Sequence, residues 1–302
     1  MLTGPPGCVL ERLNLRPRRV VVLKDVPQQN ASWLIETPGA ECLVLRRYHA
    51  GATPPDLAYE HTVLRYLATA GWAVPEPVGD LIRDAGSWFC LTRYVPGGAI
   101  SRETAEQRRR RGRDLARLHV ALRGLNARIG QRPGWRPQHT GVTPHARTDW
   151  QACVRGLTQV SPRLGSWASA AAAQTRNTLA AIGAGELPLT VVHGDFAAWN
   201  VHYQHGRLAG VIDFGLTHLD TRPYELAIAR TDRSPETMDA YRAELARNGW
   251  PLTELEQAAV VPVTHAFRIN MAAWQIDHGL RTGEYDLAMI ERQLARTGTA
   301  PP

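Results

Sequence analysis

Two stretches decide the fold and the chemistry of this chain: His193-Gly-Asp-Phe-Ala-Ala-Trp-Asn200 and Val211-Ile-Asp-Phe-Gly215. Short apolar runs lead into both, so Asp195, Asn200 and Asp213 are expected at the ends of buried strands, where an unpartnered carboxylate is costly. Asp195 and Asn200 are five positions apart, as are the base and the metal-binding amide of a kinase catalytic loop. Asp213 offers a second hard oxygen ligand for Mg²⁺. The pattern predicts a phosphoryl-transfer site.

The chain resembles the aminoglycoside phosphotransferase and choline kinase superfamily, small-molecule kinases that share the protein-kinase fold. The resemblance extends to Leu115-Ala-Arg-Leu-His119, to Tyr224-Glu-Leu-Ala227 and to the N-terminal part, so it covers most of the chain. It implies that Asp195 orients or deprotonates the acceptor hydroxyl. It also implies that Asn200 and Asp213 hold magnesium against the nucleotide phosphates.

A purely structural explanation of these residues would make Asp195 and Asp213 turn caps and Asn200 a partner for buried backbone. The agreement of the His-Gly-Asp prefix, the spacing and the second strand-end aspartate disfavours it. We expect His193 to orient the catalytic loop through hydrogen bonds rather than to transfer a proton.

A kinase-like site also needs a cation on the third strand, paired with a glutamate on the following helix. Side chains alternate along a strand, so Arg46 and Arg47 should face opposite sides, and the family pattern points to Arg46 with Glu60 as its partner. The commonest residue there is lysine, and the only lysine of this chain, Lys24, lies too early. Arginine can make bidentate phosphate contacts. We expect the pair at a solvated cleft, where its removal should change stability little; the alternative is that Arg46 is a surface strand residue.

Other nucleotide contacts are less specific in the sequence. The segment Pro27–Ser32 lies where a phosphate-covering loop belongs, and Asn30 and Ser32 could contact phosphates, although the segment has no glycine and an ordinary hairpin turn would also fit. The strand that ends near Val95 should lead into a hinge whose main chain, from Thr92 to Val95, binds adenine.

The turn signals divide the chain into a strand-rich start and a helix-rich remainder, which predicts an α+β fold with two lobes, as in protein kinases. Residues 1–95 should form a nucleotide-binding lobe, with a five-stranded antiparallel sheet and one helix. Residues 96–302 should form a mainly helical catalytic and acceptor-binding lobe. We expect its helices at these places: Ser101 (as N-cap) to Leu125, Asp149–Leu157, Ser166–Ile182, Pro235–Asn248, Leu252–Ala259, Val263–Gly279 and Asp286–Arg296.

The charge distribution bears on the partners. The net charge is +7, but the part after Gly215 has nine arginines against twelve acidic residues, so the positive excess lies in the earlier part, notably at Arg108–Arg111. This run should be the solvated face of a helix, and no nucleic-acid partner is expected because exposed aromatics do not interleave with it. The acidic C-terminal part could attract an amine-bearing acceptor through Glu236, Asp239 and Asp277, with Trp274 as a further pocket residue.

The remaining composition is that of an ordinary globular enzyme. The chain has 302 residues, of which 44% are hydrophobic, and no stretch approaches the roughly 18 apolar residues of a membrane span. The four cysteines are widely separated and are expected to be reduced and mostly buried. These features favour a cytoplasmic protein without a membrane partner.

We therefore expect an ATP- and Mg²⁺-dependent phosphotransferase that acts on a hydroxyl group of a small molecule, preferentially an antibiotic or another secondary metabolite. The alternatives are a kinase acting on Ser or Thr of a biosynthetic peptide, a kinase of a choline-like or homoserine-like metabolite, and a nucleotide-binding pseudokinase. Arg46 and the loop without glycine favour the pseudokinase, whereas the intact set of Asp195, Asn200 and Asp213 opposes it. Nothing in the sequence predicts the oligomeric state.

Overall fold

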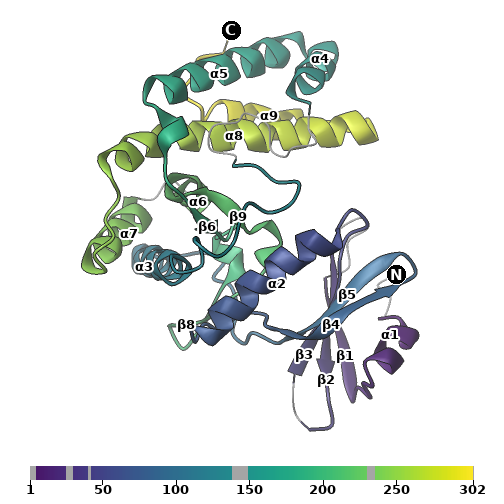
Figure 1. Ribbon diagram of the computed structural model, residues 1–302. Coiled ribbons are helices and arrows are strands. Elements are labelled where there is room, and N and C mark those ends of the chain that lie inside the picture. Colours follow the sequence, from purple (N-terminus) through teal and green to yellow (C-terminus); the bar gives the residue numbers. More distant parts are fainter. Residues whose placement is uncertain (1–4, 25–29, 40–41, 138–148, 230–234, 302) are drawn as a thin grey trace. The chain divides into compact units, whose positions relative to one another are not determined.

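The computed structural model describes residues 5–24, 30–39, 42–137, 149–229 and 235–301 (Figure 1). The chain divides into two compact units. The first contains the residues up to Ser101 together with Trp199–Gly215, and the second contains Arg102–Ala198 and the residues from Leu216 onward. The expected lobe boundary after Val95 lies six residues before the end of the first segment of unit 1, and the later segment also groups with this unit. The assignment of nucleotide binding to one lobe and catalysis to the other stays a prediction.

Unit 1 is built on a five-stranded antiparallel sheet, which confirms the expected fold class. The strands lie in the order β1-β2-β3-β5-β4. Their bounds, with those of the helices among the described residues of this unit, are β1 Arg19–Lys24, β2 Ala31–Glu36, β3 Cys42–Arg47, β4 Pro77–Asp84, β5 Ser87–Arg93, α1 Gly7–Arg12 and α2 Pro54–Thr69.

The sheet is covered on both faces because its side chains alternate. Trp33 on β2 and Phe89 on β5 are buried with Val9 of α1 on one face. Tyr48, just after β3, and Cys90 are buried with Leu57 of α2 on the other. The burial of alternate residues along β2 follows the period of two of a pleated strand. Helix α2 therefore lies behind the strand that carries Arg46.

A short ribbon of β7 (Val201–Gln204) and β8 (Arg207–Val211) completes unit 1. A Cβ at Gly97 would lie only 2.9 Å from Ala209 Cβ, so glycine permits this close approach of the chain to the ribbon. The backbone N–H of Val211 donates to the carbonyl of Ala73 over 3.0 Å. These contacts hold the ribbon, and with it the segment that follows β8, within unit 1.

Unit 2 is mainly helical, as expected, with one two-stranded antiparallel sheet of β6 and β9. Two apolar clusters hold it together, one centred on α4, α5, α8 and α9 and one between α6 and α8. The bounds are α3 Ala105–Leu122, α4 Trp150–Val160, α5 Pro162–Ala181, β6 Leu189–Val192, β9 His218–Thr221, α6 Arg222–Ala229, α7 Pro235–Arg247, α8 Glu254–Thr282 and α9 Leu287–Leu294. None of the described helices is long and apolar enough to cross a membrane.

Two helix predictions were wrong in detail. Helix α3 is capped by Thr104 in a capping box with Gln107, not by Ser101, because the Thr104 hydroxyl accepts the N–H of Gln107. The two helices expected on either side of Pro262 form one helix, α8, with the proline inside it. A proline removes one backbone donor but does not have to end a helix whose flanks are buried on both sides. The sequence pattern also did not predict α1 or α6.

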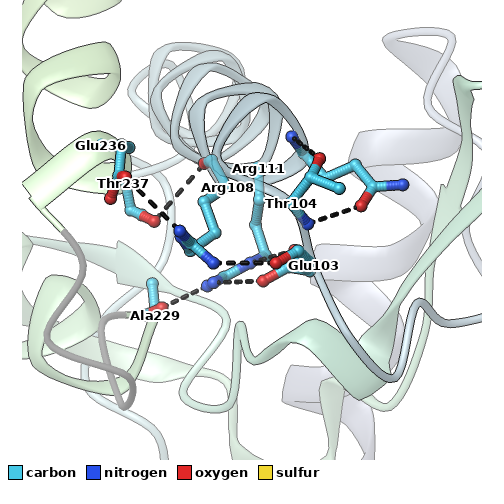
Figure 2. A network of polar contacts seen from close by, with 8 residues as sticks. Glu103, Thr104, Arg108, Arg111, Ala229, Glu236 and Thr237 are labelled. Carbon is cyan, nitrogen blue, oxygen red and sulfur yellow. Dashed lines mark hydrogen bonds and ion pairs between the residues drawn. The ribbon is translucent and has the colours of Figure 1, made fainter.

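The arginine run of α3 is only half solvated, contrary to the sequence-based expectation. Figure 2 shows Arg108 and Arg111 pointing toward Glu103 and the end of α6. Arg111 is buried, binds the Glu103 carboxylate through two nitrogens over 2.8 and 2.7 Å, and donates to the Ala229 carbonyl. Gly112 allows the backbones of α3 and α7 to meet, because a Cβ there would overlap the backbone of Thr237. This part of the run is therefore a structural joint between helices.

Candidate active site

The loop that carries Asp195 leaves β6 through a glycine that the geometry requires. Gly194 has φ +83°, and a Cβ there would overlap the backbone of Leu216. The Asp195 N–H donates to Nδ1 of the buried His193 over 3.1 Å. His193 thus orients the loop by a hydrogen bond, as the sequence predicted.

A buried carboxylate holds the same loop from the other side. Glu225 of α6 accepts the N–H of Gly194 over 2.9 Å and the N–H of Phe196 over 3.1 Å, one on each carboxylate oxygen. These are the residues on either side of Asp195. Burial raises the pKa of Glu225 to about 7, against the lowering effect of the two N–H donors. The sequence analysis noted this residue only as part of the Tyr-Glu-Leu-Ala motif, and its anchoring role could not be predicted from the sequence.

The two predicted metal ligands lie at one end of the β7–β8 ribbon. Val201 pairs with Val211, and the N–H of Ile212 donates to the Asn200 carbonyl over 2.9 Å, so Asn200 and Asp213 flank this register on opposite strands. Asp213 has φ +61°, a region that residues other than glycine rarely adopt. The role of Asp213 as a metal ligand stays a prediction.

Arg46 joins the helix behind the sheet to the ribbon. Its Nη1 lies 3.5 Å from Glu60 Oε1, which confirms the predicted ion pair, and its Nη2 lies 3.0 Å from Asp213 Oδ1. The expectation of a solvated pair was wrong, because the Arg46 and Glu60 side chains are only 11% and 2% exposed. Burial alone would lower the pKa of Arg46, but the Glu60 and Asp213 carboxylates outweigh it and keep the guanidinium charged. The neighbouring Arg47 points the other way, over the ring of Trp33.

A second layer that sequence reasoning missed supports this pair. The guanidinium carbon of Arg46 lies 5.1 Å from the centre of the Tyr48 ring. The Tyr48 hydroxyl lies 3.0 Å from Nε2 of His61 and 3.5 Å from Glu60 Oε1. Burial lowers the pKa of His61 to about 4, so the ring is neutral at pH 7 and adds no charge beside Glu60. The β-strand alternation places Tyr48 and Arg46 on one face, which is the signal that could have found it.

The other predicted nucleotide contacts are placed as follows. Asn30 Oδ1 accepts the N–H of His49 over 2.9 Å, so it ties the start of β2 to the end of β3. Ser32 pairs with Arg46 across β2 and β3. Thr92 and Val95 are buried near the end of β5, and the Thr92 hydroxyl lies 3.4 Å from the Val44 carbonyl. Residues 27–29 of the predicted phosphate-covering loop lie outside the described residues. The nucleotide roles of these positions stay predictions.

The acidic residues proposed for the acceptor differ in their surroundings. Glu236 Oε1 lies 3.4 Å from Arg108 and Asp277 Oδ2 lies 3.0 Å from Arg281, so both charges are partly matched by neighbouring arginines. Asp239 is exposed on α7. Trp274 is 45% exposed on α8. Matched charges weaken the electrostatic attraction on which the prediction rested.

The side chains of Asn200, Asp213 and Arg46 are suited to bind magnesium and a nucleoside triphosphate. Mg²⁺ is commonly held by one or two protein oxygens plus substrate phosphates, and Asn200 and Asp213 are of this type. Nε of Arg46 is a buried donor without an acceptor among the residues that the structure describes, as expected of a cation that awaits an anionic ligand. In the same described part of the chain, no group of three His, Cys, Asp or Glu side chains gathers as it would at a zinc site.

Comparison with known proteins agrees with this geometry. The model of the phosphotransferase enzyme family matches residues 25–259, most of the chain. The chain belongs to this family. It is 27% identical to the homoserine kinase of Phenylobacterium zucineum (strain HLK1), over 90% of this chain and 86% of the relative. It is 28% identical to that of Xanthobacter autotrophicus (strain ATCC BAA-1158 / Py2), over 77% and 72%.

Solved structures confirm the fold. An aminoglycoside phosphotransferase in complex with ADP and hygromycin B matches with a TM-score of 0.69 and 17% identity, over 96% of this chain and 95% of that one. Amicoumacin kinase in complex with AMP-PNP, Ca²⁺ and its ligand matches with a TM-score of 0.70 and 16% identity, over 96% and 92%. A microcompartment-associated aminopropanol kinase matches with a TM-score of 0.65 and 18% identity, over 96% and 93%. This family member is thus a phosphotransferase with an alcohol group as acceptor.

Proposed function

We propose that this phosphotransferase uses magnesium and ATP to phosphorylate the hydroxyl of a small amine-bearing alcohol, with homoserine as the first candidate. The observation that carries the proposal is the arrangement at the end of the β7–β8 ribbon. There Asn200 and Asp213 flank one register, and Arg46 lies 3.0 Å from Asp213 and 3.5 Å from Glu60. These groups match the needs of a bound triphosphate and its metal.

Each of these residues has a distinct part in the proposed reaction. ATP would supply the γ-phosphoryl group and leave as ADP, and a bound magnesium ion would offset the charge of the phosphates. Asn200 and Asp213 would hold the metal ion, and Arg46, kept in place by Glu60, would bind phosphate oxygens through its remaining donors. Asp195 positions the acceptor hydroxyl and accepts its proton. Glu225 keeps Asp195 in place by binding the N–H groups of both neighbouring residues.

The acceptor class is supported by the comparisons. Homoserine, aminopropanol and aminoglycosides, which give their names to the enzymes that match this chain, all carry an amino group as well as a hydroxyl. Homoserine stands first because the curated relatives that cover most of the chain bear its name. An antibiotic is the second candidate, favoured by the structural match to the complex with hygromycin B. The buried Arg46–Glu60 pair argues against a pseudokinase, because the arginine is held ready for phosphates.

The test is an acceptor screen. Purified protein is incubated with ATP and Mg²⁺ and, in separate reactions, with homoserine, 3-aminopropan-1-ol, choline, hygromycin B and a Ser/Thr peptide, and products are identified by mass spectrometry. We expect the mass of one added phosphoryl group on homoserine and no product without Mg²⁺. Phosphorylation of hygromycin B alone would support the second candidate, and no product with any acceptor would contradict the proposed activity.

A further inference from the structure

One face of α8 runs from the interior of unit 2 to solvent. Phe267, Asn270 and Trp274 follow one another at helical spacing, three and four residues apart, so they lie along the same face. Phe267 and Asn270 are buried, whereas Trp274 is exposed. This face therefore begins in the protein core and ends at the surface.

The burial of Asn270 is energetically unfavourable. Its side chain is buried, and both Oδ1 and Nδ2 lack a hydrogen-bond partner among the residues that the structure describes. A buried amide with neither hydrogen bond made costs the free energy of removing both groups from water. Ala266 and Ala273, four residues before and three residues after Asn270 on the helix, are buried and apolar, so an apolar residue of similar size would be more favourable here. A cost of this kind points to a ligand that satisfies the amide.

The buried end of this face is connected to the catalytic loop within unit 2. The ring of Phe267 meets the ring of Tyr224 edge-on, with centroids 6.1 Å apart. Tyr224 directly precedes Glu225, the residue that anchors the loop around Asp195. Burial raises the pKa of Tyr224, and nearby carboxylates, Asp195 among them, raise it further. Asn270 thus lies one helical turn from a residue that adjoins the loop anchor.

We propose that Asn270 recognises the amino-acid end of the acceptor. Its Oδ1 accepts from the α-ammonium group, and its Nδ2 donates to the α-carboxylate. This inference rests on the proposed function and specifies the acceptor as a hydroxy-amino acid. An amide offers one acceptor and one donor side by side, and a carbon that bears both an ammonium and a carboxylate offers the complement. The two charges of such a group also neutralise each other, so it is cheaper to bury beside a neutral amide than a lone ammonium.

The experiment compares Asn270→Leu, which replaces the amide by an apolar group of similar size, with the matched control Gln275→Leu, which makes the same chemical change elsewhere on α8. The two acceptors are homoserine and 3-aminopropan-1-ol, which differs from homoserine only by the missing carboxylate. KM for each acceptor and for ATP, the calorimetric affinity for homoserine and the thermal melting temperature are measured for all three proteins.

We expect Asn270→Leu to raise KM for homoserine by about 10- to 100-fold, which corresponds to loss of hydrogen bonds to charged groups. The preference for homoserine over 3-aminopropan-1-ol should decrease, and KM for ATP should stay within about twofold of the wild-type value. The melting temperature should equal or exceed that of the wild type, because an unsatisfied amide has been removed. Gln275→Leu should leave all the kinetic values unchanged.

Three results would overturn the inference without affecting the kinase activity. The first is an unchanged KM and affinity for homoserine in Asn270→Leu. The second is an equal loss for homoserine, 3-aminopropan-1-ol and ATP together with a lower melting temperature, which would indicate a structural role. The third is a wild type that phosphorylates hygromycin B but neither binds nor phosphorylates homoserine. If homoserine binds through Asn270 but no acceptor is phosphorylated, the proposed function fails while the binding inference stands.

Discussion

At the scale of single residues, Arg46 shows how a position that departs from the common lysine is accommodated. The guanidinium reaches both Glu60 and Asp213, and Tyr48 lies against it. The planar guanidinium of arginine can donate hydrogen bonds to both carboxylates at once. The compact ammonium group of lysine does this less well. The sequence was sufficient to predict the pair with Glu60. It could not show the burial of the pair, because burial depends on α2 packing over the sheet.

The burial of Arg46 leads to a stability prediction. Arg46→Ala leaves the Glu60 carboxylate buried without its main cation, so we expect a loss on the order of 3 kcal/mol in the free energy of unfolding. Arg46→Lys should lose less and keep partial activity. Chemical denaturation checks the stability, and calorimetry with Mg-ATP checks the affinity. An Arg46→Ala protein with wild-type stability would show that the pair is solvated after all.

Glu225 gives a prediction about pH. In the unfolded chain its carboxyl has its ordinary pKa near 4.5, and in the folded protein burial raises the pKa to about 7. The folded state therefore holds the proton more tightly, and the stabilisation from this group is complete below about pH 4.5 and is lost as the pH rises to 7. Activity should change in the opposite direction, because only the carboxylate accepts well from both Gly194 and Phe196.

We thus expect kcat to fall as the pH drops through about 7, and the Glu225→Gln variant, which cannot ionise, to lose this dependence. Above about pH 7 the variant should also be slower than the wild type, because its amide nitrogen faces one of the two loop donors. The measurement is kcat against pH at saturating ATP and acceptor. If the variant kept the same titration near pH 7, another group would be responsible for it.

At the scale of secondary structure elements, the sequence predicted the five-stranded antiparallel sheet of unit 1, because alternation and turn residues mark its strands. Helix boundaries in unit 2 were less predictable. The proline inside α8 is tolerated because α8 packs against distant elements, such as α5 and α9. The N-cap of α3 is set locally, by the capping box of Thr104 and Gln107. The joint between α3 and α7 could not be predicted either, because the sequence of a run of four arginines does not show which of them are buried.

The joint that Arg111 of α3 makes with Glu103 and the end of α6 can be tested by a pair of variants. Arg111→Ala leaves Glu103 buried without its partner and should lower the free energy of unfolding by about 3 kcal/mol. Arg109→Ala removes only an exposed pair with Glu106 and should change it by less than about 1 kcal/mol. Urea denaturation of both proteins gives the comparison. Equal effects of the two substitutions would contradict the assignment of Arg111 to a structural joint.

At the scale of the whole molecule, the predicted chemistry is divided between the two units along one continuous segment. His193 and Asp195 belong to unit 2, and Asn200 and Asp213 belong to unit 1, so the chain passes from one unit to the other between the proposed base and the proposed metal ligands. The sequence motif points to all four residues because their spacing matches a kinase catalytic loop, and their roles stay predictions. It could not predict the acceptor, which depends on side chains from separate helices.

Because Asp213 and Asp195 have different proposed roles, we expect their substitutions to affect Mg-ATP binding differently. Asp213→Ala should weaken Mg-ATP binding by about tenfold or more, because it removes a proposed metal ligand. Asp195→Asn should leave Mg-ATP binding nearly unchanged. Calorimetry with and without Mg²⁺ measures both. If Mg-ATP bound to Asp213→Ala as tightly as to the wild type, Asp213 would not be a metal ligand.

The central claim is that this chain transfers the γ-phosphoryl group of ATP to an acceptor hydroxyl positioned by Asp195. The most direct measurement follows phosphohomoserine formation by ³¹P NMR in the wild type and in Asp195→Asn, with equal Mg-ATP occupancy established beforehand. We predict product formation by the wild type and a rate lower by a factor on the order of 10² or more in the variant. Equal rates in the two proteins would contradict the account.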